Sequence, residues 1–376
     1  MDEKDRLLLS YLQNGLPLTP RPFDVWSAKI GSDSAELLVR IQRLKREGTF
    51  GGIKAILDPR AFHYQSAWVA VRIGQERHLL SDAAELESRT EVLWQHPGVV
   101  YGCEREHEFN LWFFIAVPSG YDLELHVQCL GKLAGAQRVL FLPVRKVFKG
   151  TDLLSSLDAE TFPAMSERFE KRCLSSRATS TSCGNSEISS RLQAPGEAVL
   201  EDGLSAEEIG MIRKLQEPFP LTDEPYRKIA SDLGITEVQA LERMMSLIGK
   251  GCLKKIGSFL KSVATVTETR TLLVWQIPEE KLERLGPEIA DFGEVLYAGR
   301  RPAYPEFPYS LYTVVRAETA AALDLLTRRI QDRIGKWPHQ VLVTTRELKK
   351  ERIKYFPKEL DVWWRTSCHV VETAFH

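Results

Sequence analysis

A chain of 376 residues is too long for one ordinary hydrophobic core, so two to four domains are expected. Its 43% hydrophobic and 27% charged residues are typical of a soluble globular protein, and a net charge of −1 gives no overall attraction to nucleic acid or anionic lipid. No apolar run approaches the roughly 18 residues of a membrane span, and no signal-peptide core is present, so we expect a cytoplasmic protein. The six scattered cysteines form no Cys-x-x-Cys pair, which argues against a zinc or iron–sulfur site.

The first 50 residues predict three short helices. Leucines recur at helical spacing within residues 1–15, Pro22–Ile30 fits a second helix, and Ser32 can cap a third helix that runs from Asp33 to Glu47. A Gly turn precedes the third helix, which is typical of a helix-turn-helix. We therefore predict a helix-turn-helix domain over residues 1–50.

Residues 51–150 follow a β-α-β-β-α-β order after a short wing. The predicted elements include a strand over Ala67–Ile73, a helix that ends at His96-Pro97-Gly98, a hairpin over residues 99–117 and a final strand over Arg138–Val144. This order is ferredoxin-like, with two helices on one face of an antiparallel sheet. The expected fold class is therefore α+β.

The second half of the chain repeats the first. Residues 151–203 are rich in Ser and Thr and are predicted to be a linker. A second helix-turn-helix domain follows over residues 204–256, then a second ferredoxin-like domain over 257–358 and a C-terminal tail over 359–376. A repeat of about 200 residues is a duplicated two-domain unit rather than a solenoid, and we expect its two copies to pair as an intramolecular pseudo-dimer.

The two predicted hairpins carry the most informative side chains. The first reads Tyr101-Gly-Cys-Glu-Arg105-Glu-His107-Glu-Phe-Asn110-Leu-Trp112. The second reads Tyr297-Ala-Gly-Arg300-Arg301-Pro-Ala-Tyr304-Pro-Glu-Phe-Pro-Tyr309-Ser-Leu-Tyr312, with four extra residues in its turn. Both place Tyr-x-x-x-Arg at the end of one strand and Leu-aromatic at the start of the next. Charged and aromatic groups gathered where two buried strands meet are what a binding or catalytic site needs.

A helix-turn-helix followed by a ferredoxin-like domain resembles the Lrp/AsnC regulators, and the hairpin motifs resemble a more specific family. Arg105-Glu-His107-x-x-Asn110-Leu-Trp112-Phe is similar to the signature of one subunit type of siroheme decarboxylase. Tyr297-x-x-Arg300-Arg301-Pro, with Pro308-Tyr309-x-Leu-Tyr312-Thr, is similar to that of the partner subunit type. The chain thus resembles a fused two-subunit form. The resemblance implies removal of acetate carboxyl groups from siroheme as CO2, to give 12,18-didecarboxysiroheme in haem or haem d1 biosynthesis.

The second hairpin departs from the family pattern. It has Ser310 where the family usually has Asn, Arg316 where a His is common, and Pro305-Glu306-Phe307 in place of a more usual Gly-Trp. The motif also contains no His. Two alternatives follow for this half-site: it binds without catalysing, or it accepts a modified substrate.

His107 is the expected proton donor, and Arg105 is the second expected catalytic residue. His107 stands between Arg105 and an apolar strand, at a predicted strand mouth and inside the matched motif. A histidine can supply a proton to the carbon that CO2 leaves. The conjugated macrocycle can take up the electron pair, so neither an organic cofactor nor a protein-bound metal is expected. Iron enters only as part of the siroheme.

The expected ligand contacts are cationic and aromatic. Guanidinium groups match carboxylates bidentately, which suits a tetrapyrrole with many acidic side chains. The aromatic residues either face the flat ring or belong to the core, and Asn110 either orients His107 or binds a carboxylate. The expected substrate-binding residues are Tyr101, Asn110, Trp112, Tyr297, Arg300, Arg301, Tyr309 and Tyr312, with Arg60 and His63 as weaker candidates.

A DNA-binding regulator is the main alternative function. The third helix of each helix-turn-helix would then present its first residues to bases and phosphates. This chain offers Asp33 and Glu36 in one copy and Glu237 with Gln239 in the other, and acid at that end repels phosphate. Specific DNA binding is therefore not expected. A non-catalytic tetrapyrrole sensor and a homodimer of the whole chain both stay open.

Overall fold

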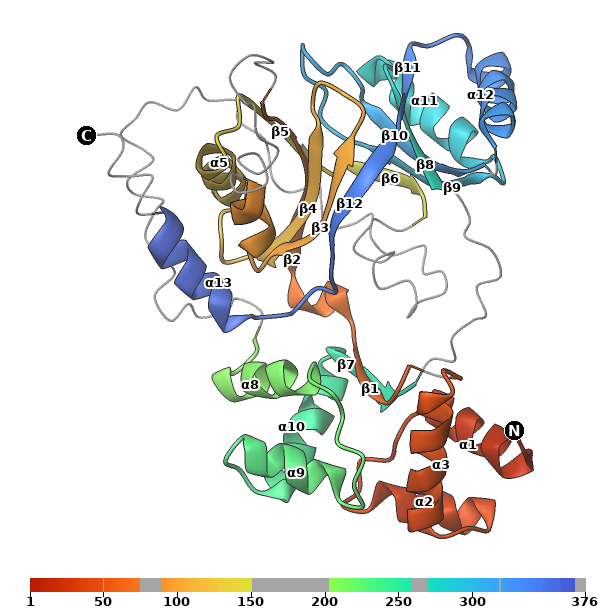
Figure 1. Ribbon diagram of the computed structural model, residues 1–376, viewed down its shortest axis with the longest axis vertical. Coiled ribbons are helices and arrows are strands. Elements are labelled where there is room, and N and C mark those ends of the chain that lie inside the picture. The colour runs from red at the N-terminus through yellow and green to blue at the C-terminus, as the bar shows by residue number, and fades with distance from the viewer. Residues whose placement is uncertain (50, 75–89, 151–202, 259–269, 318, 369–376) are drawn as a thin grey trace.

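The computed structural model divides into a helical end and an end that holds two β-sheets (Figure 1). No helix in the part of the chain that it describes is long and apolar enough to cross a membrane. The predicted linker, apart from Gly203, and most of the predicted helix before His96 lie outside the described residues. The described residues are 1–49, 51–74, 90–150, 203–258, 270–317 and 319–368.

The first helix-turn-helix contains the three helices that the sequence predicts, with one correction at a helix start. Asp33, rather than Ser32, caps the third helix, because the Asp33 carboxylate accepts a hydrogen bond from the Glu36 N–H at 2.7 Å. Ser32 instead donates its hydroxyl to the Glu36 side chain at 2.5 Å. The helices are α1 (Glu3–Asn14), α2 (Pro22–Ile30) and α3 (Ser34–Arg46).

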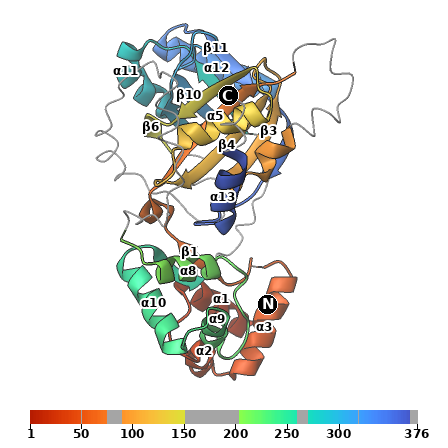
Figure 2. The same ribbon diagram turned by 90° about the vertical axis from the view of Figure 1, so that its left-hand side faces the viewer.

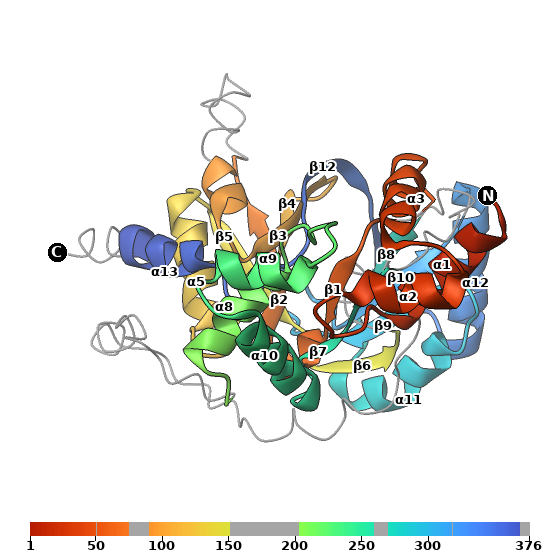
Figure 3. The ribbon, with the colours of Figure 1, turned by 90° about the horizontal axis from the view of Figure 1, so that it is seen from below.

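The second helix-turn-helix repeats this arrangement and shares a core with the first. Capping boxes at Ser205 and Thr236 begin its first and third helices. The two wings pair antiparallel, and one apolar cluster contains buried residues of both units, such as Leu12 and Tyr226. Figure 3 shows the wings between the two sets of helices. The elements are α8 (Ala206–Leu215), α9 (Pro225–Asp232), α10 (Glu237–Gly249) and the wing strands β1 (Lys54–Leu57) and β7 (Leu253–Gly257).

Each half also builds the expected ferredoxin-like sheet. The strand with the sequence Leu-Trp-Phe-Phe-Ile-Ala-Val-Pro is buried along its whole length, because one face meets a helix layer and the other faces the opposite half. The first half contributes β2 (Tyr64–Arg72), β3 (Val99–Arg105), β4 (Leu111–Pro118), α5 (Leu123–Leu133) and β5 (Arg138–Pro143). The second contributes β8 (Arg270–Trp275), α11 (Glu279–Ala290), β9 (Val295–Arg300), β10 (Leu311–Arg316), α12 (Ala320–Ile334) and β11 (His339–Leu342).

The two halves exchange one strand each, which the sequence does not predict. Strand β6 (Lys146–Lys149) leaves the first half and pairs with β9, and β12 (Thr344–Lys350) leaves the second half and pairs with β3. The strand orders are therefore β12-β3-β4-β2-β5 and β11-β8-β10-β9-β6. Between the facing sheets, Ala70 and Trp112 of one half pack with Val274 and Phe307 of the other. These contacts make the fold an intramolecular pseudo-dimer (Figure 2).

Part of the segment that was expected to be a tail is folded onto the first sheet domain. Helix α13 (Lys358–Trp363) continues into a π-helical turn over Trp364–Cys368, and Leu360, Trp363 and Trp364 join the core under α5.

A buried histidine pair lies beneath this C-terminal helix. His96 Nε2 is 3.0 Å from His126 Nδ1, and His96 Nδ1 accepts the Gly98 N–H at 2.9 Å. Neutral His96 therefore carries its proton on Nε2 and donates it to His126. The His126 ring lies 4.2 Å from the Trp364 ring, centroid to centroid. The sequence analysis assigns neither histidine a role, and the structure gives both a place in the packing of α13.

Candidate active site

The two hairpins are equivalent at their first and last positions. The Arg105 N–H donates to the Asn110 carbonyl at 2.8 Å, and the Arg301 N–H donates to the Ser310 carbonyl at 3.0 Å. The four extra residues of the second hairpin therefore lie between these positions, within residues 302–309.

Asn110 and Ser310 perform the same structural task. The Asn110 amide accepts the Ile73 N–H at 3.1 Å and donates to the Ile73 carbonyl at 3.0 Å. The Ser310 hydroxyl accepts the Ile277 N–H at 3.3 Å and donates to the Ile277 carbonyl at 2.5 Å. Asn110 therefore does not orient His107, contrary to one of the two roles expected for it. The serine that departs from the family pattern keeps the contact that the asparagine makes.

Arg105 and Arg301 are buried, with exposed fractions of 9% and 3%. Arg105 Nη1 donates to the Leu342 carbonyl at 2.7 Å, and Arg301 Nη1 donates to the Leu142 carbonyl at 2.6 Å. Each arginine thus reaches across to the last ferredoxin-like strand of the other half. This geometry makes Arg105 a connection between the two halves, a structural role that differs from the catalytic one predicted from the sequence.

Most of the expected ring-facing aromatics are core residues. Trp112 is buried and donates its indole N–H to the Phe109 carbonyl at 2.9 Å, and Tyr101 packs edge-on against Trp68. Tyr312 is also buried, and its hydroxyl has no hydrogen-bond partner among the described residues. The remaining expected aromatics are Tyr297, whose hydroxyl accepts from Arg301, and Tyr309, which packs on Phe307.

A cavity of about 360 Å³ opens at the end of β9. Arg145, Arg300 and Arg301 line it, and Arg300 forms an ion pair with Glu279, the first residue of α11. Burial and the neighbouring Arg145 guanidinium both lower the pKa of Arg300. Arg300 and Arg301 are predicted from the sequence, whereas Arg145 is not. The other lining residues are Gln276, Ile277, Pro278, Leu282, Ala303, Pro308, Ser310, Trp337 and Pro338.

His107 is half-buried in the turn of the first hairpin. Its Nδ1 accepts the Phe109 N–H at 3.0 Å, so the neutral ring carries its proton on Nε2. The ring stacks on Phe109 and meets Phe307 of the second half edge-on, at a centroid distance of 5.4 Å. Burial lowers the pKa of His107, and the Glu108 charge and a hydrogen bond with Gln340 oppose this effect. His107 is therefore mostly neutral at pH 7 in the ligand-free protein.

The turn of the second hairpin connects the arginine pocket with His107. Ala303 and Pro308 of that turn line the pocket, and Phe307 between them contacts the His107 ring. The turn also crosses to the other half, because the Tyr304 hydroxyl donates to the Phe141 carbonyl at 2.7 Å. His107 does not line the pocket itself. The segment 302–309 lines the pocket with Ala303 and Pro308 and contacts the His107 ring through the buried Phe307.

The structure does not bring Arg60 and His63 to this site. Arg60 belongs to the 3-10 helix Pro59–Phe62 and His63 is an exposed residue with φ +46°, both at the start of β2. The hairpin turn lies beside the other end of that strand, since Val71 pairs with Leu111. Nine strand residues separate the two ends, which is roughly 30 Å. Both weaker candidates therefore lie apart from the arginine pocket and from His107.

Comparison with known proteins agrees with this arrangement. Residues 5–50 and 208–253 match the siroheme decarboxylase NirDL-like HTH domain, and residues 267–349 match the AsnC-like ligand binding domain. A siroheme decarboxylase of Hydrogenobacter thermophilus is 28% identical over 95% of this chain and 96% of its own length. The siroheme decarboxylase alpha subunit of Desulfovibrio desulfuricans is 30% identical over 40% of this chain and 81% of its own length.

A solved structure is similar over nearly the whole chain. The siroheme decarboxylase NirDL, crystallised with an iron-uroporphyrin III analogue, has a TM-score of 0.66 and 25% identity over 98% of this chain and 100% of its own. The fold and the pocket thus define a fused pair of helix-turn-helix and AsnC-like ligand-binding units. The chain belongs to the siroheme decarboxylase family and is therefore an enzyme.

Proposed function

We propose that this chain removes acetate carboxyl groups from siroheme as CO2, and that the product is 12,18-didecarboxysiroheme for haem or haem d1 biosynthesis. The observation that carries this proposal is the continuous segment at residues 302–309, which joins the arginine pocket to His107. Cationic groups that bind carboxylates and a donor that can protonate carbon are the two things that this reaction needs. The relative crystallised with an iron-uroporphyrin III analogue supports a tetrapyrrole ligand.

Arg300 is the proposed contact for a substrate carboxylate. Its side chain is 19% exposed and lines the cavity, so it combines access with partial shielding from water. Partial burial strengthens a guanidinium–carboxylate pair relative to one in open solvent. Arg301 and Arg105, which are hydrogen-bonded across the halves, hold the two hairpins in register. The second hairpin, which has no histidine, is proposed to bind without donating a proton.

His107 is the proposed proton source. When the bond to CO2 breaks, an electron pair stays on the methylene carbon and the conjugated macrocycle takes it up. In the imidazolium form of His107, Nδ1 carries a proton and no longer accepts the Phe109 N–H. This form gives its Nε2 proton to that carbon, a methyl group forms, and solvent returns a proton to Nε2. Substrate carboxylates near His107 favour the imidazolium form, so bound substrate raises the pKa that burial lowers. No organic cofactor takes part in this scheme.

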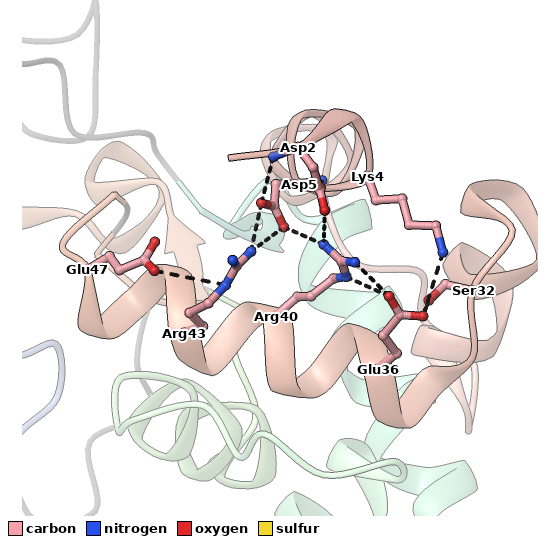
Figure 4. A network of polar contacts seen from close by, with 8 residues as sticks. All are labelled: Asp2, Lys4, Asp5, Ser32, Glu36, Arg40, Arg43 and Glu47. Carbon is pink, nitrogen blue, oxygen red and sulfur yellow. Dashed lines mark hydrogen bonds and ion pairs between the residues drawn. The ribbon is translucent and has the colours of Figure 1, made fainter.

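The main alternative function, DNA binding, conflicts with the charges on α3. Arg40 contacts Asp2 and Asp5 at 2.7 and 2.9 Å, and Arg43 contacts Asp5 at 2.7 Å (Figure 4). Burial raises the pKa of Asp5, but the Asp2 backbone N–H and both guanidiniums outweigh it and lower that pKa. Asp5 thus stays charged and holds the side chains of Arg40 and Arg43 against helix α1. Glu36 adds acid at the start of the helix that would enter a groove.

We expect no sequence-selective complex with DNA at nanomolar protein. The reason is that Arg40 and Arg43 of α3 are paired with carboxylates, which reduces the counterion release available to drive binding. Selection from a random duplex library at physiological salt, followed by gel shift, measures this directly, with a DNA-binding Lrp/AsnC regulator as the positive control. A salt-resistant, sequence-selective complex would overturn the expectation.

Release of CO2 from siroheme distinguishes an enzyme from a non-catalytic tetrapyrrole sensor. Anaerobic incubation of the full chain with siroheme, with CO2 measured against protein-free siroheme, tests the proposal. Catalytic release of CO2 supports a decarboxylase. A siroheme complex that forms and never releases CO2 would instead establish the sensor.

A further inference from the structure

The strand exchange places a residue of the first half in the pocket of the second. Strand β6 pairs with β9, with Lys146 in register with Arg300, and the Arg145 N–H donates to the Arg300 carbonyl at 2.9 Å. The backbone therefore fixes Arg145 beside Arg300 at the mouth of the cavity. Without the first half, the pocket lacks this guanidinium.

The pocket has the electrostatics of an anion site. Three guanidinium groups, those of Arg145, Arg300 and Arg301, line it, and like charges in a partly shielded cavity repel one another. Arg145 is exposed and forms no ion pair with any residue that the structure describes. Pro278 and Glu279, at the amino end of α11, also line the cavity, and that helix end carries partial positive charge. A bound carboxylate would reduce the repulsion between the guanidinium groups, give Arg145 an ion-pair partner and interact favourably with the amino end of α11.

Glu279 is the cavity-lining carboxylate that pairs with Arg300, and Glu283 lies 4.0 Å from the same guanidinium. The Glu279 side chain is 72% exposed. An exposed ion pair contributes little free energy, so Glu279 can turn to solvent at small cost. Glu279 can therefore compete weakly with a ligand carboxylate for Arg300.

We propose that Arg145 and Arg300, one from each half, together bind one carboxylate side chain of the tetrapyrrole substrate, and that Glu279 holds this place until the substrate arrives. The inference rests on the proposed function, because it names the acidic tetrapyrrole as the ligand. It adds that the subsite is incomplete in either half alone. Arg145 is in this account a binding residue, remote from proton transfer.

Two substitutions with opposite expected effects on binding affinity test the subsite. Arg145→Ala is expected to weaken binding of iron-uroporphyrin III by roughly 10- to 100-fold, as expected for a lost charge-assisted hydrogen bond. Glu279→Gln is expected to tighten binding by about 2- to 5-fold, because a weak competing ion pair is removed. Absorbance titration of the full chain measures both, and steady-state kinetics with siroheme should show Arg145→Ala acting on KM more than on kcat.

Arg227→Ala is the matched control. Arg227 is an exposed arginine of α9 that pairs with Glu224 in the second helix-turn-helix and does not line the cavity, so its replacement by alanine should leave affinity unchanged. Arg145→Lys, which keeps the charge but not the planar guanidinium, should recover part of the affinity.

If the wild-type protein, Arg145→Ala and Glu279→Gln all bind equally well, the subsite is wrong while the proposed function stands. If wild-type protein binds tetrapyrrole but releases no CO2 from siroheme, the function fails and the subsite result remains valid. Absence of wild-type binding would overturn both.

Discussion

Replacing His107 with alanine is expected to lower the rate of siroheme decarboxylation by about 10²–10⁴-fold, the usual cost of losing a positioned acid. Tetrapyrrole binding should be largely retained, because the arginine pocket is untouched. His107 Nδ1 faces the Phe109 N–H, so Nε2 is the ring nitrogen left to deliver the proton once the ring is protonated. Single-turnover rates measured anaerobically, beside absorbance titration, separate the two effects. His63→Ala, at the far end of β2, is the control and should change neither.

The pH profile gives the same prediction an independent readout. A proton donor must be protonated, so activity should fall as pH rises through the pKa of His107. Burial places that pKa below the usual histidine value in the free protein, and substrate carboxylates raise it in the complex. The descending limb of kcat/KM should therefore lie at lower pH than that of kcat. Near-wild-type turnover in His107→Ala, together with loss of chemistry but not binding in Arg300→Ala, would reverse the assigned roles.

Replacing Trp364 with alanine is expected to destabilise the first sheet domain by about 3–5 kcal/mol, the usual range for a buried tryptophan. Trp364 is 4% exposed and packs on His126 within the core under α5. Val362, on the same C-terminal helix, is 61% exposed, and its replacement by alanine should cost less than about 0.5 kcal/mol. Urea unfolding followed by circular dichroism measures both. Equal unfolding midpoints for the two variants would show that α13 does not support the domain.

The histidine pair makes this packing sensitive to acid. Burial above all, and then the charges of His126 and Lys349, lower the pKa of His96, and burial lowers the pKa of His126 to about 3. The unfolded chain therefore binds more protons than the folded chain below the unfolded value of about 6.5, and stability falls with pH from there toward 3. Each histidine contributes up to about 1.4 kcal/mol per pH unit in that window. Stability of His126→Phe should depend less on pH than that of the wild type.

Local patterns in the sequence predict the parts of this fold that depend on local physics. The capping box at Ser205, the helices of both helix-turn-helix units and the all-apolar strand Leu111–Pro118 are each visible within a dozen residues. Strands β6 and β12 are not, because each is short and rich in charge and its pairing partner lies in the other half of the chain. Arg145 is missed for the same reason, since only the exchange of β6 brings it to Arg300.

The candidate site is partly predictable, for a reason that its residues explain. His107 and Arg300 stand out because each lies beside an apolar strand within a motif that resembles a known family. Asn110 and Arg105 stand out equally, yet both form hydrogen bonds with the backbone. Asn110 bonds the N–H and carbonyl of Ile73, and Arg105 donates to the Leu342 carbonyl, and no sequence pattern reveals either contact. A polar residue at the end of a strand can bind a ligand or form hydrogen bonds with the backbone. Only the three-dimensional positions of Ile73 and Leu342 show that Asn110 and Arg105 do the second.

The most direct test of the account is the mass of the product formed from siroheme under anaerobic conditions in D2O. Wild-type protein should yield a product that has lost one or two CO2 units, with one deuterium on carbon for each unit lost, because each departing carboxyl is replaced by a proton exchanged through His107. His107→Ala should form the siroheme complex and yield almost none of this product. Siroheme recovered with unchanged mass from a wild-type complex, or deuterated product formed equally fast by His107→Ala, would contradict the account.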